Sequence, residues 1–244
     1  MKKILFLSAL LCVGLSSAEL VRSSVSAYAT GYSTHDSNLP DGITAVEFIE
    51  TSDDRCDYID TGVIPEKSWA YEIRAMVTGN YTYQYLFGCQ KNVHYTSMSG
   101  FCVPLRTWSS FYFTLFYENQ NVGAIKYGNM LGKIFDIALS PYEFKVDVEG
   151  HTYTMEPSRE MSREPEANLC LFVHNDIQPS GTYYTVGRIY RFRAFDGEGN
   201  IVIDYQPVRF TNEFGYEEGA MYDFVSGELF RNQGTGNFII GPDL

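Results

Sequence analysis

From residue 46 onward the chain is a succession of short runs in which apolar and polar residues alternate, each ended by turn-forming residues. The run "WAYEIRAMV" alternates along its length, and "YQYLFGCQ", "SFYFTLFYEN" and "YEFKVDVEGHTYTM" are similar in length. About a dozen such runs with regular turn signals are typical of a β-sandwich or β-barrel. No long segment repeats its apolar residues every 3.6 positions, and the 19 Tyr and 17 Phe favour strands. The sequence therefore predicts an all-β protein with little helix.

The clearest hairpin consists of "GRIYRFRAF" and "IVIDYQPVRF", joined by "DGEGN". The two glycines of the joining segment supply the backbone freedom that a tight reversal needs. Alternation places Tyr190, Phe192 and Ala194 on one face and Arg191 and Arg193 on the other. We expect an antiparallel strand with one buried face.

The stretch "GAMYDFVSGELFRNQGTGNFIIG", from Gly219 to Gly241, holds two further turns. Ser226-Gly227 separates "AMYDFV" from "ELFRN", and "QGTGN" separates "ELFRN" from the short run "FII". The stretch contains no nucleophile–base pair and no cluster of metal ligands. Its glycines therefore predict turns of a closing hairpin rather than an active-site loop.

This closing stretch resembles the last motif of bacterial LamG-like jellyroll domains, in the concanavalin A-like lectin/glucanase superfamily. "GRIYRFRAFDGEGNIVIDYQPVRF" resembles the penultimate hairpin of that family, and "VEFIETSDDRCDYIDTGVIP" resembles its opening strand. The resemblance implies a two-sheet antiparallel jellyroll sandwich whose first and last strands meet. It also implies an extracellular role in binding glycan or protein, and it says little about the site because these motifs mark strands and turns.

The N-terminus has the composition of a secretory signal. Lys2 and Lys3 precede the apolar run "ILFLSALLCVGL", and "SSA" offers small residues for cleavage before Glu19. We expect a signal peptide at 1–18, a polar arm at 19–41 and the jellyroll domain at 42–244. The protein is then secreted, periplasmic or on the cell surface of a bacterium, with no transmembrane segment after the signal.

The formal charge of the whole chain is −12. Loss of Lys2 and Lys3 with the signal reduces the 18 basic residues to 16 against 30 acidic ones, which gives −14. Such a surface repels phosphate backbones and anionic lipid, so we expect no nucleic-acid partner and no direct adhesion to membranes. The oligomeric state is left open.

Four cysteines follow the signal: Cys56, Cys89, Cys102 and Cys170. They lack metal-site spacing, because no pair is separated by two residues and no histidine is close. Export permits disulfides, and a hairpin between Cys89 and Cys102 favours that bridge, which leaves Cys56 with Cys170. Four buried thiols are the equally weighted alternative.

Exposed aromatic rings beside amides are the groups that bind sugars. "GNYTYQY" provides Asn80, Tyr81 and Tyr83, and "RTWSSFY" places Trp108 in a turn-like setting. These four residues are the candidate ligand-binding set. The alternative is that the tyrosine stripe belongs to the core or to a cross-strand ladder.

No cofactor is required by the sequence, and Ca²⁺ is the one metal for which it offers ligands. "TSDDRCD" brings Asp53, Asp54 and Asp57 into one loop, and carboxylate oxygens suit Ca²⁺. The alternative is an acidic loop in solvent.

Retaining glucanases of the resembled superfamily carry E-x-D-x-E on one strand. Here "KVDVE" gives Lys145, Asp147 and Glu149, so the first carboxylate is missing. We therefore expect no enzyme but an exported module that binds glycan or a surface protein. A structural or assembly protein of the cell surface is the first alternative, and a glycosidase or lyase using Asp147 and Glu149 is the second.

Overall fold

The computed structural model describes residues 39–52, 57–81, 83–90, 99–107, 110–118, 120–173 and 184–244. The expected signal peptide 1–18 and most of the arm 19–41 lie outside these residues, as do Asp53, Asp54, Cys56 and Trp108. The domain boundaries therefore stay a prediction.

The described chain is built from strands alone, which confirms the all-β prediction. In chain order they are β1 (Ile43–Ala45), β2 (Ile49–Glu50), β3 (Ile59–Asp60), β4 (Ala70–Val77), β5 (Tyr83–Gly88), β6 (Phe101–Thr107), β7 (Phe111–Tyr117), β8 (Gln120–Tyr127), β9 (Ile134–Leu139), β10 (Phe144–Val148), β11 (His151–Met155), β12 (Cys170–Leu171), β13 (Gly187–Phe195), β14 (Ile201–Thr211), β15 (Glu217–Asp223), β16 (Leu229–Arg231) and β17 (Ile239–Ile240).

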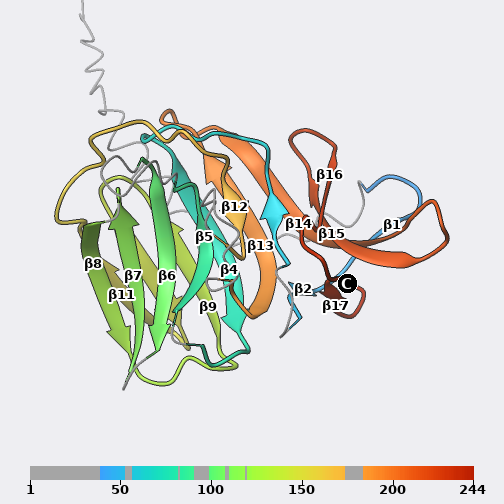
Figure 1. Cartoon of the computed structure of the whole chain (residues 1–244), viewed down its shortest axis with the longest axis horizontal. Helices are drawn as coiled ribbons and strands as arrows, with labels where there is room; N and C mark the ends of the chain where they lie inside the picture. The colour runs from blue at the N-terminus through green and yellow to red at the C-terminus, as the bar shows by residue number, and fades with distance from the viewer. Residues whose placement is uncertain are drawn as a thin grey trace, which may run out of the picture.

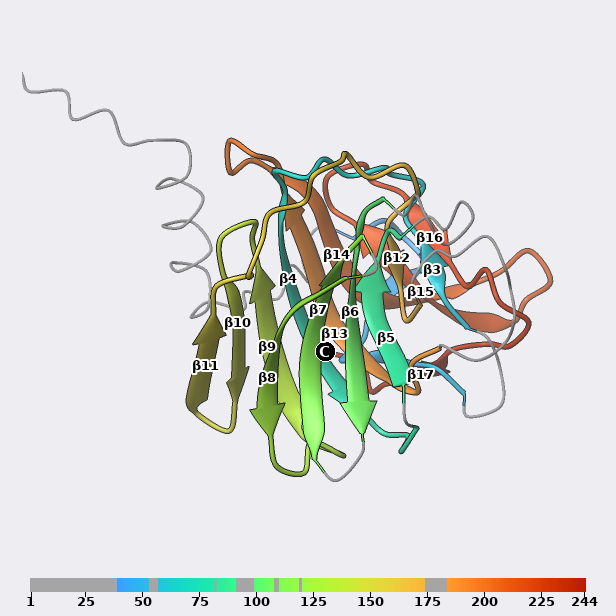
Figure 2. The ribbon, with the colours of Figure 1, turned by 60° about the vertical axis from the view of Figure 1, so that its left-hand side comes forward.

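The strands form two antiparallel sheets stacked as a jellyroll sandwich (Figures 1 and 2). The larger sheet has the order β11-β10-β9-β4-β13-β14-β15-β16, with β1 beside β14 and β2 between β13 and β17. The smaller sheet has the order β3-β12-β5-β6-β7-β8. Strands β8 and β11 are the last strands on the same side of the two sheets, where they lie close together (Figure 2).

The core lies between the sheets and is rich in aromatic rings. Phe87 and Phe101 of the smaller sheet contact Tyr71 and Phe192 of the larger one, with ring centroids 4.8–5.8 Å apart. Edge-to-face and tilted contacts of this kind add about 0.5–1.5 kcal/mol each beyond the burial of their area. The aromatic content that favoured strands in the sequence thus fills the sandwich.

The predicted hairpin of "GRIYRFRAF" and "IVIDYQPVRF" is confirmed as β13 and β14, with Phe192 opposite Tyr205. One expectation about its faces is wrong. The register against β4 shifts between Ile189 and Arg191, so Ile189 and Phe192 are both in the core whereas Tyr190 packs against Phe48. A bulge of this kind inserts one residue and resets the alternation.

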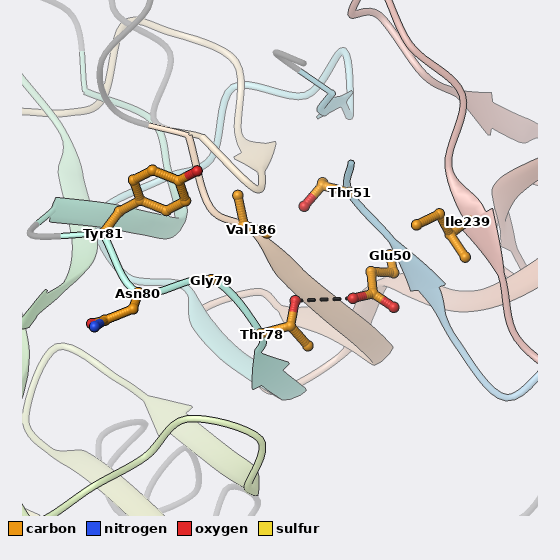
Figure 3. A pocket seen from close by; sticks show the side chains of 8 residues that line it. All are labelled: Glu50, Thr51, Thr78, Gly79, Asn80, Tyr81, Val186 and Ile239. Atoms are coloured by element: carbon orange, nitrogen blue, oxygen red, sulfur yellow. Dashed lines mark hydrogen bonds between the residues drawn. The ribbon is translucent and has the colours of Figure 1, made fainter. Parts of the chain in front are cut away.

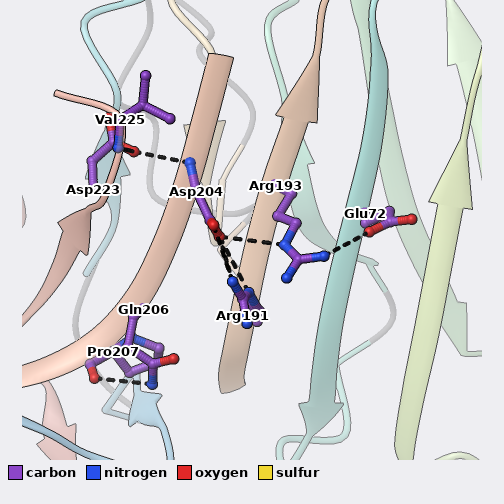
Figure 4. Close-up of polar contacts among 8 residues, drawn as sticks. All are labelled: Glu72, Arg191, Arg193, Asp204, Gln206, Pro207, Asp223 and Val225. Carbon is purple, nitrogen blue, oxygen red and sulfur yellow. Dashed lines mark hydrogen bonds and ion pairs between the residues drawn. The ribbon is translucent and has the colours of Figure 1, made fainter. Parts of the chain in front are cut away.

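The face of β13 opposite the core is also buried, which the sequence analysis did not predict. Arg191 is 5% exposed and Arg193 is 9% exposed. Asp204 of β14 accepts hydrogen bonds from Nη2 of Arg191 at 2.7 Å and from Nε of Arg193 at 3.3 Å (Figure 4). Nη1 of Arg193 lies 3.7 Å from Glu72 of β4. The two arginines of β13 are thus neutralised by carboxylates on the neighbouring strands β14 and β4. Because these charges are paired, both faces of β13 can be buried.

Glu72 carries the most perturbed carboxyl of this cluster. Burial raises its pKa to about 7, against the opposing attraction of Arg193 and Arg191. A carboxyl in such surroundings is neutral or ionised according to small changes of pH.

The closing stretch forms β15, β16 and β17 with the turns that its glycines predicted. Gly227 has a φ of +75° and donates its N–H to the Asp223 carbonyl at 2.8 Å. Strand β17, near the C-terminus, pairs with β2, near the start of the domain in sequence, and Val46 forms a β-bridge with Asp243. The opening and closing segments of the domain therefore meet, as the family resemblance implied.

Candidate functional site

An open pocket of about 540 Å³ lies where β2, β4, β13 and β17 come together. Its walls include Asn80 and Tyr81 from the turn after β4, and Ile239 from β17 (Figure 3). Tyr81 is 45% exposed and Ile239 is 52% exposed. The volume is within the range of small-molecule sites, and the two apolar side chains stand at opposite sides of it.

The turn that carries Tyr81 is fixed by a buried amide. Gln84 is fully buried, donates Nε2–H to the Gly79 carbonyl at 2.7 Å and accepts the Val186 N–H at 2.9 Å. The Val186 carbonyl in turn accepts the N–H groups of Thr78 and Gly79 at 3.0 and 3.1 Å. Because these four hydrogen bonds fix Thr78, Gly79 and Val186, the start of the turn is positioned before any ligand arrives.

Gly79 permits the close approach of Val186 and the Tyr81 ring. A Cβ at this position would lie 2.6 Å from Cβ of Val186 and 3.0 Å from Cε2 of Tyr81. Any side chain here would push the ring from its place. The glycine of "GNY" thus sets the orientation of the aromatic platform.

The polar side of the pocket is formed by the Glu50 carboxylate, and each of its two oxygens has a partner. Glu50 accepts the Thr78 hydroxyl at Oε1 (2.9 Å) and pairs through Oε2 with Nε of Arg188 (2.8 Å). The Arg188 guanidinium lies 4.1 Å from the Phe48 ring centroid. Each carboxylate oxygen has a second lone pair, so Glu50 retains the capacity to accept hydrogen bonds from ligand hydroxyls.

These groups can bind an uncharged polar ligand with one apolar face. A tyrosine ring, a threonine hydroxyl and an ion-paired carboxylate offer stacking together with donors and acceptors for hydroxyl groups, whereas the Asn80 carboxamide points away from Glu50 (Figure 3).

The structure brings two of the four predicted ligand-binding residues to this pocket, Asn80 and Tyr81. Tyr83 is the first residue of β5 and pairs through its backbone with Arg106, and its side chain is outside the described part. Trp108 is outside the described residues altogether. Sequence analysis missed Glu50 and Ile239, because each lies on a strand of only two residues, too short for a visible alternation.

The proposed calcium ligand Asp57 does not fit a metal site. It is fully buried, and its Oδ1 accepts hydrogen bonds from Nδ2 of Asn232 (2.7 Å) and the N–H of Gly236 (3.0 Å). Its Oδ2 accepts from the hydroxyl and N–H of Ser52 at 2.9 and 3.3 Å. Both oxygens are thus occupied by hydrogen donors, and within the described residues no group of three or more His, Cys, Asp or Glu side chains could hold a metal ion. Asp57 instead ties the opening segment to the "NQGTG" turn.

The predicted Cys89–Cys102 disulfide is wrong. Both are free, buried thiols, as is Cys170. Cys102 lies opposite Gly88, so the neighbouring Cys89 points to the other face of the sheet, into the core. The alternative of buried thiols therefore describes these three residues. Because Cys170 is a free thiol, the predicted Cys56–Cys170 bridge is wrong as well, although Cys56 itself lies outside the described residues.

Asp147 and Glu149 do not share a site. Asp147 pairs with Nζ of Lys145 at 2.8 Å on the face of β10. Glu149 is in the turn after β10, with a φ of +50°, and pairs with Nζ of Lys133 at 2.7 Å. A retaining glycosidase needs two carboxyls facing one substrate bond, and these two are held by different partners.

No family model matches the sequence, and no curated protein matches it either. Among solved structures, one similar fold is a protein from Bacteroides ovatus described provisionally as carbohydrate-binding. It has a TM-score of 0.54 and 11% identity, and the match covers 82% of this chain and 60% of that one. A SAP-like pentraxin from Limulus polyphemus has a TM-score of 0.47 at 13% identity, covering 66% of this chain and 79% of that one. Domains LG4-5 of the mouse laminin alpha1 chain reach 0.39 at 6% identity, covering 86% and 82%.

The fold is a lectin-like jellyroll. The two antiparallel sheets and the match to the Bacteroides ovatus protein agree on this, and at 11% identity the match concerns the fold alone. In the described part of the chain we find no helix with the length and apolar character needed to cross a bilayer.

Proposed function

We propose that this protein is an exported glycan-binding module and that the Tyr81 pocket is its binding site. The observation that carries the proposal is the exposed Tyr81 ring, which lies close to Gly79 in a turn that Gln84 and Val186 fix by hydrogen bonds, on the opposite side of an open cavity from Glu50. An aromatic platform with polar groups at its side is the arrangement that binds a sugar ring. The jellyroll fold and the carbohydrate-binding description of the Bacteroides ovatus protein support the same class. The basic and apolar N-terminus supports export, and the closing motifs support a LamG-like domain over 42–244.

The test begins with a glycan-array screen of the chain from Glu19, followed by titration calorimetry with the best ligand. Tyr81→Ala removes the stacking surface, and we expect binding to weaken about five- to tenfold, since such a contact is worth about 1 kcal/mol or slightly more. Asn80→Ala removes a carboxamide that points away from Glu50 (Figure 3), and we expect a smaller loss.

Tyr216→Ala is the matched control. Tyr216 is 70% exposed on the turn between β14 and β15, so its removal deletes a tyrosine that is more accessible than Tyr81 and does not line the pocket. Equal affinities of Tyr81→Ala and the unmodified chain, or an equal loss of affinity in Tyr81→Ala and Tyr216→Ala, would show that the Tyr81 pocket is not the binding site. If the folded protein bound no glycan on the array, the glycan-binding function itself would be refuted.

A protein-binding or assembly role is the second candidate, and one observation favours it. Phe214 is 75% exposed beside Tyr216, so two aromatic rings project from the same turn. Exposed aromatic residues are enriched in protein interfaces. Light scattering over a range of concentrations tests this role, with a concentration-dependent mass that Phe214→Ser abolishes as the supporting result.

A further inference from the structure

The hairpin of β14 and β15 ends in a turn that presents two aromatic side chains to solvent. Phe214 is 75% exposed and Tyr216 is 70% exposed. Glu213, next to Phe214 in sequence, is also exposed and has no cationic partner among the described residues. We call residues Glu213–Tyr216 the tip. In Figure 1 the hairpin extends to the right-hand end of the molecule, so the tip is accessible to a partner.

The backbone of this turn is fixed by its own hydrogen bonds. Oδ1 of Asn212 accepts the N–H groups of Phe214 at 2.9 Å and of Tyr216 at 3.0 Å. The Asn212 N–H donates to the Tyr216 carbonyl at 2.8 Å, and its carbonyl accepts the Gly215 N–H at 3.0 Å. The φ of Gly215 is +84°, which a glycine adopts without strain. A turn held in this way loses little backbone entropy when its side chains dock on a partner.

A second surface of interest is the outer face of the smaller sheet over β6, β7 and β8. Alternate residues of β7 are in the core, which places Tyr112 and Phe116 on the outer face. In the register of these strands, Tyr112 lies between Arg106 of β6 and Lys126 of β8. The Arg106 guanidinium is 4.7 Å from the Phe116 ring centroid, and Nζ of Lys126 is 5.9 Å from the Tyr112 ring centroid. We call these four residues the docking face.

The charge of the docking face is opposite to that of the chain as a whole. Strands β5 to β8 contain no Asp or Glu, although the chain has 30 acidic residues against 18 basic ones. Lys126 is exposed, and among the described residues it has no carboxylate partner. The ring of Tyr112 holds its ammonium group at the surface without neutralising it. The docking face thus combines aromatic surface with positive charge.

The tip and the docking face lie on opposite sides of the molecule (Figures 1 and 2). Strand β8 is at the end of the smaller sheet that lies beside β11, whereas β14 and β15 are near the other end of the larger sheet. The tip therefore cannot reach the docking face of its own chain. Every copy nevertheless carries both surfaces, and aromatic rings with a carboxylate complement aromatic rings with an ammonium group.

We propose that the tip of one copy binds the docking face of a second copy of this chain. Phe214 and Tyr216 pack on Tyr112 and Phe116, and the carboxylate of the tip pairs with Lys126. Because the two surfaces are on opposite sides, the contact is head-to-tail and leads to a ring or an extended assembly. The proposal rests on the assembly role given above as the second candidate function and names its partner. It does not depend on glycan binding.

The experiment measures the mass of the chain from Glu19 by light scattering as its concentration is raised. We expect the mass to rise with concentration, and to rise less at high salt. Phe214→Ser removes an aromatic anchor, and Lys126→Glu places a like charge opposite the tip. Each should raise the dissociation constant at least tenfold. Arg163→Glu is the matched control for the charge reversal, because the Arg163 side chain is exposed and has no carboxylate partner among the described residues.

Two combinations of variants identify the contact itself. Phe214→Ser keeps the docking face and Lys126→Glu keeps the tip, so a mixture of the two should form complexes of two chains that neither variant forms alone. Glu213→Lys together with Lys126→Glu in one chain reverses the ion pair and should restore assembly. A mixture that stays monomeric, or an equal effect of Lys126→Glu and Arg163→Glu, would overturn the proposal.

The outcomes separate this proposal from the functions on which it borders. A mass that stays constant at every concentration and salt would refute the assembly role together with the proposal. Assembly that Phe214→Ser abolishes and Lys126→Glu leaves intact would preserve the assembly role and overturn the docking face. Tyr81→Ala should assemble like the unmodified chain, so its effect on glycan binding tests the Tyr81 pocket alone.

Discussion

Removal of the Asp204 carboxylate should destabilise the fold strongly, because this one group compensates two buried guanidinium groups. It accepts hydrogen bonds from Arg191 at 2.7, 3.0 and 3.2 Å and from Arg193 at 3.3 Å. The side chains of Asp204, Arg191 and Arg193 are 9%, 6% and 10% exposed. In Asp204→Ala the carboxylate that both cations share is lost, and Glu72 stays 3.7 Å from Arg193. Breaking a buried pair on one side costs about 3–5 kcal/mol, and we expect about 4 kcal/mol here.

The assay is urea unfolding at pH 7, followed by far-ultraviolet circular dichroism, with the slope compared between variants. Glu164→Ala is the control, because the Lys67–Glu164 pair is 47% and 57% exposed and should contribute less than about 1 kcal/mol. The double variant Arg191→Met with Asp204→Ala should lose less than the sum of the two single losses, since it removes the uncompensated cation. A loss in Asp204→Ala no larger than in Glu164→Ala would refute the argument.

Three further predictions concern the pH response, the thiols and the closing turn. The pKa of Glu72 is about 7 in the folded chain and 4.5 in the unfolded chain, so its contribution to the free energy of unfolding is present at low pH and is lost as pH rises. In urea titrations, the free energy of unfolding of Glu72→Gln should therefore rise by about 2–3 kcal/mol relative to that of the unmodified chain between pH about 5 and 7.5. Burial raises the pKa of the Cys89 thiol to about 12, so Cys89, Cys102 and Cys170 should resist alkylation in the native chain and react in denaturant, whereas a bridged Cys89–Cys102 peptide in mass spectra would contradict this. Asn232→Ala removes hydrogen bonds between the opening and closing segments and should cost about 2–4 kcal/mol by thermal unfolding, and an unchanged melting temperature would contradict that role.

The sequence sufficed for the fold because its local signals agree with one another. Alternation identified the long strands such as β4 and β13. Two glycines identified the turn at 196–200, and Ser226-Gly227 identified the turn after β15. The hairpin and the closing stretch carry both signals, and both are confirmed.

The sequence-based predictions that proved wrong share one physical cause. Which face a side chain occupies depends on the register between two paired strands, and one strand's sequence does not fix that register. The bulge beside Tyr190 depends on how β13 meets β4, so alternation alone put this ring in the core. The opposite facing of Cys89 and Cys102 follows from the pairing of Gly88 with Cys102, which no spacing reveals.

The candidate sites were partly predictable for the same reason. Asn80 and Tyr81 are adjacent in sequence and could be found together, whereas Glu50 and Ile239 reach the same pocket only through the pairing of β2 with β17. The docking face combines residues of β6, β7 and β8, and none of these strands alone suggests it.

Because β2 pairs with both β13 and β17, the larger sheet can be completed only at the end of protein synthesis. While the polypeptide is being synthesised, β2 emerges early and waits for β13, and then for β17, before both of its edges are covered. At about 5–20 residues per second, the growing chain spends on the order of ten seconds or more with Ile49 and its neighbours unpaired. Contacts between such distant segments also slow folding itself, so the nascent protein depends on being kept from other strand edges until β17 has been made.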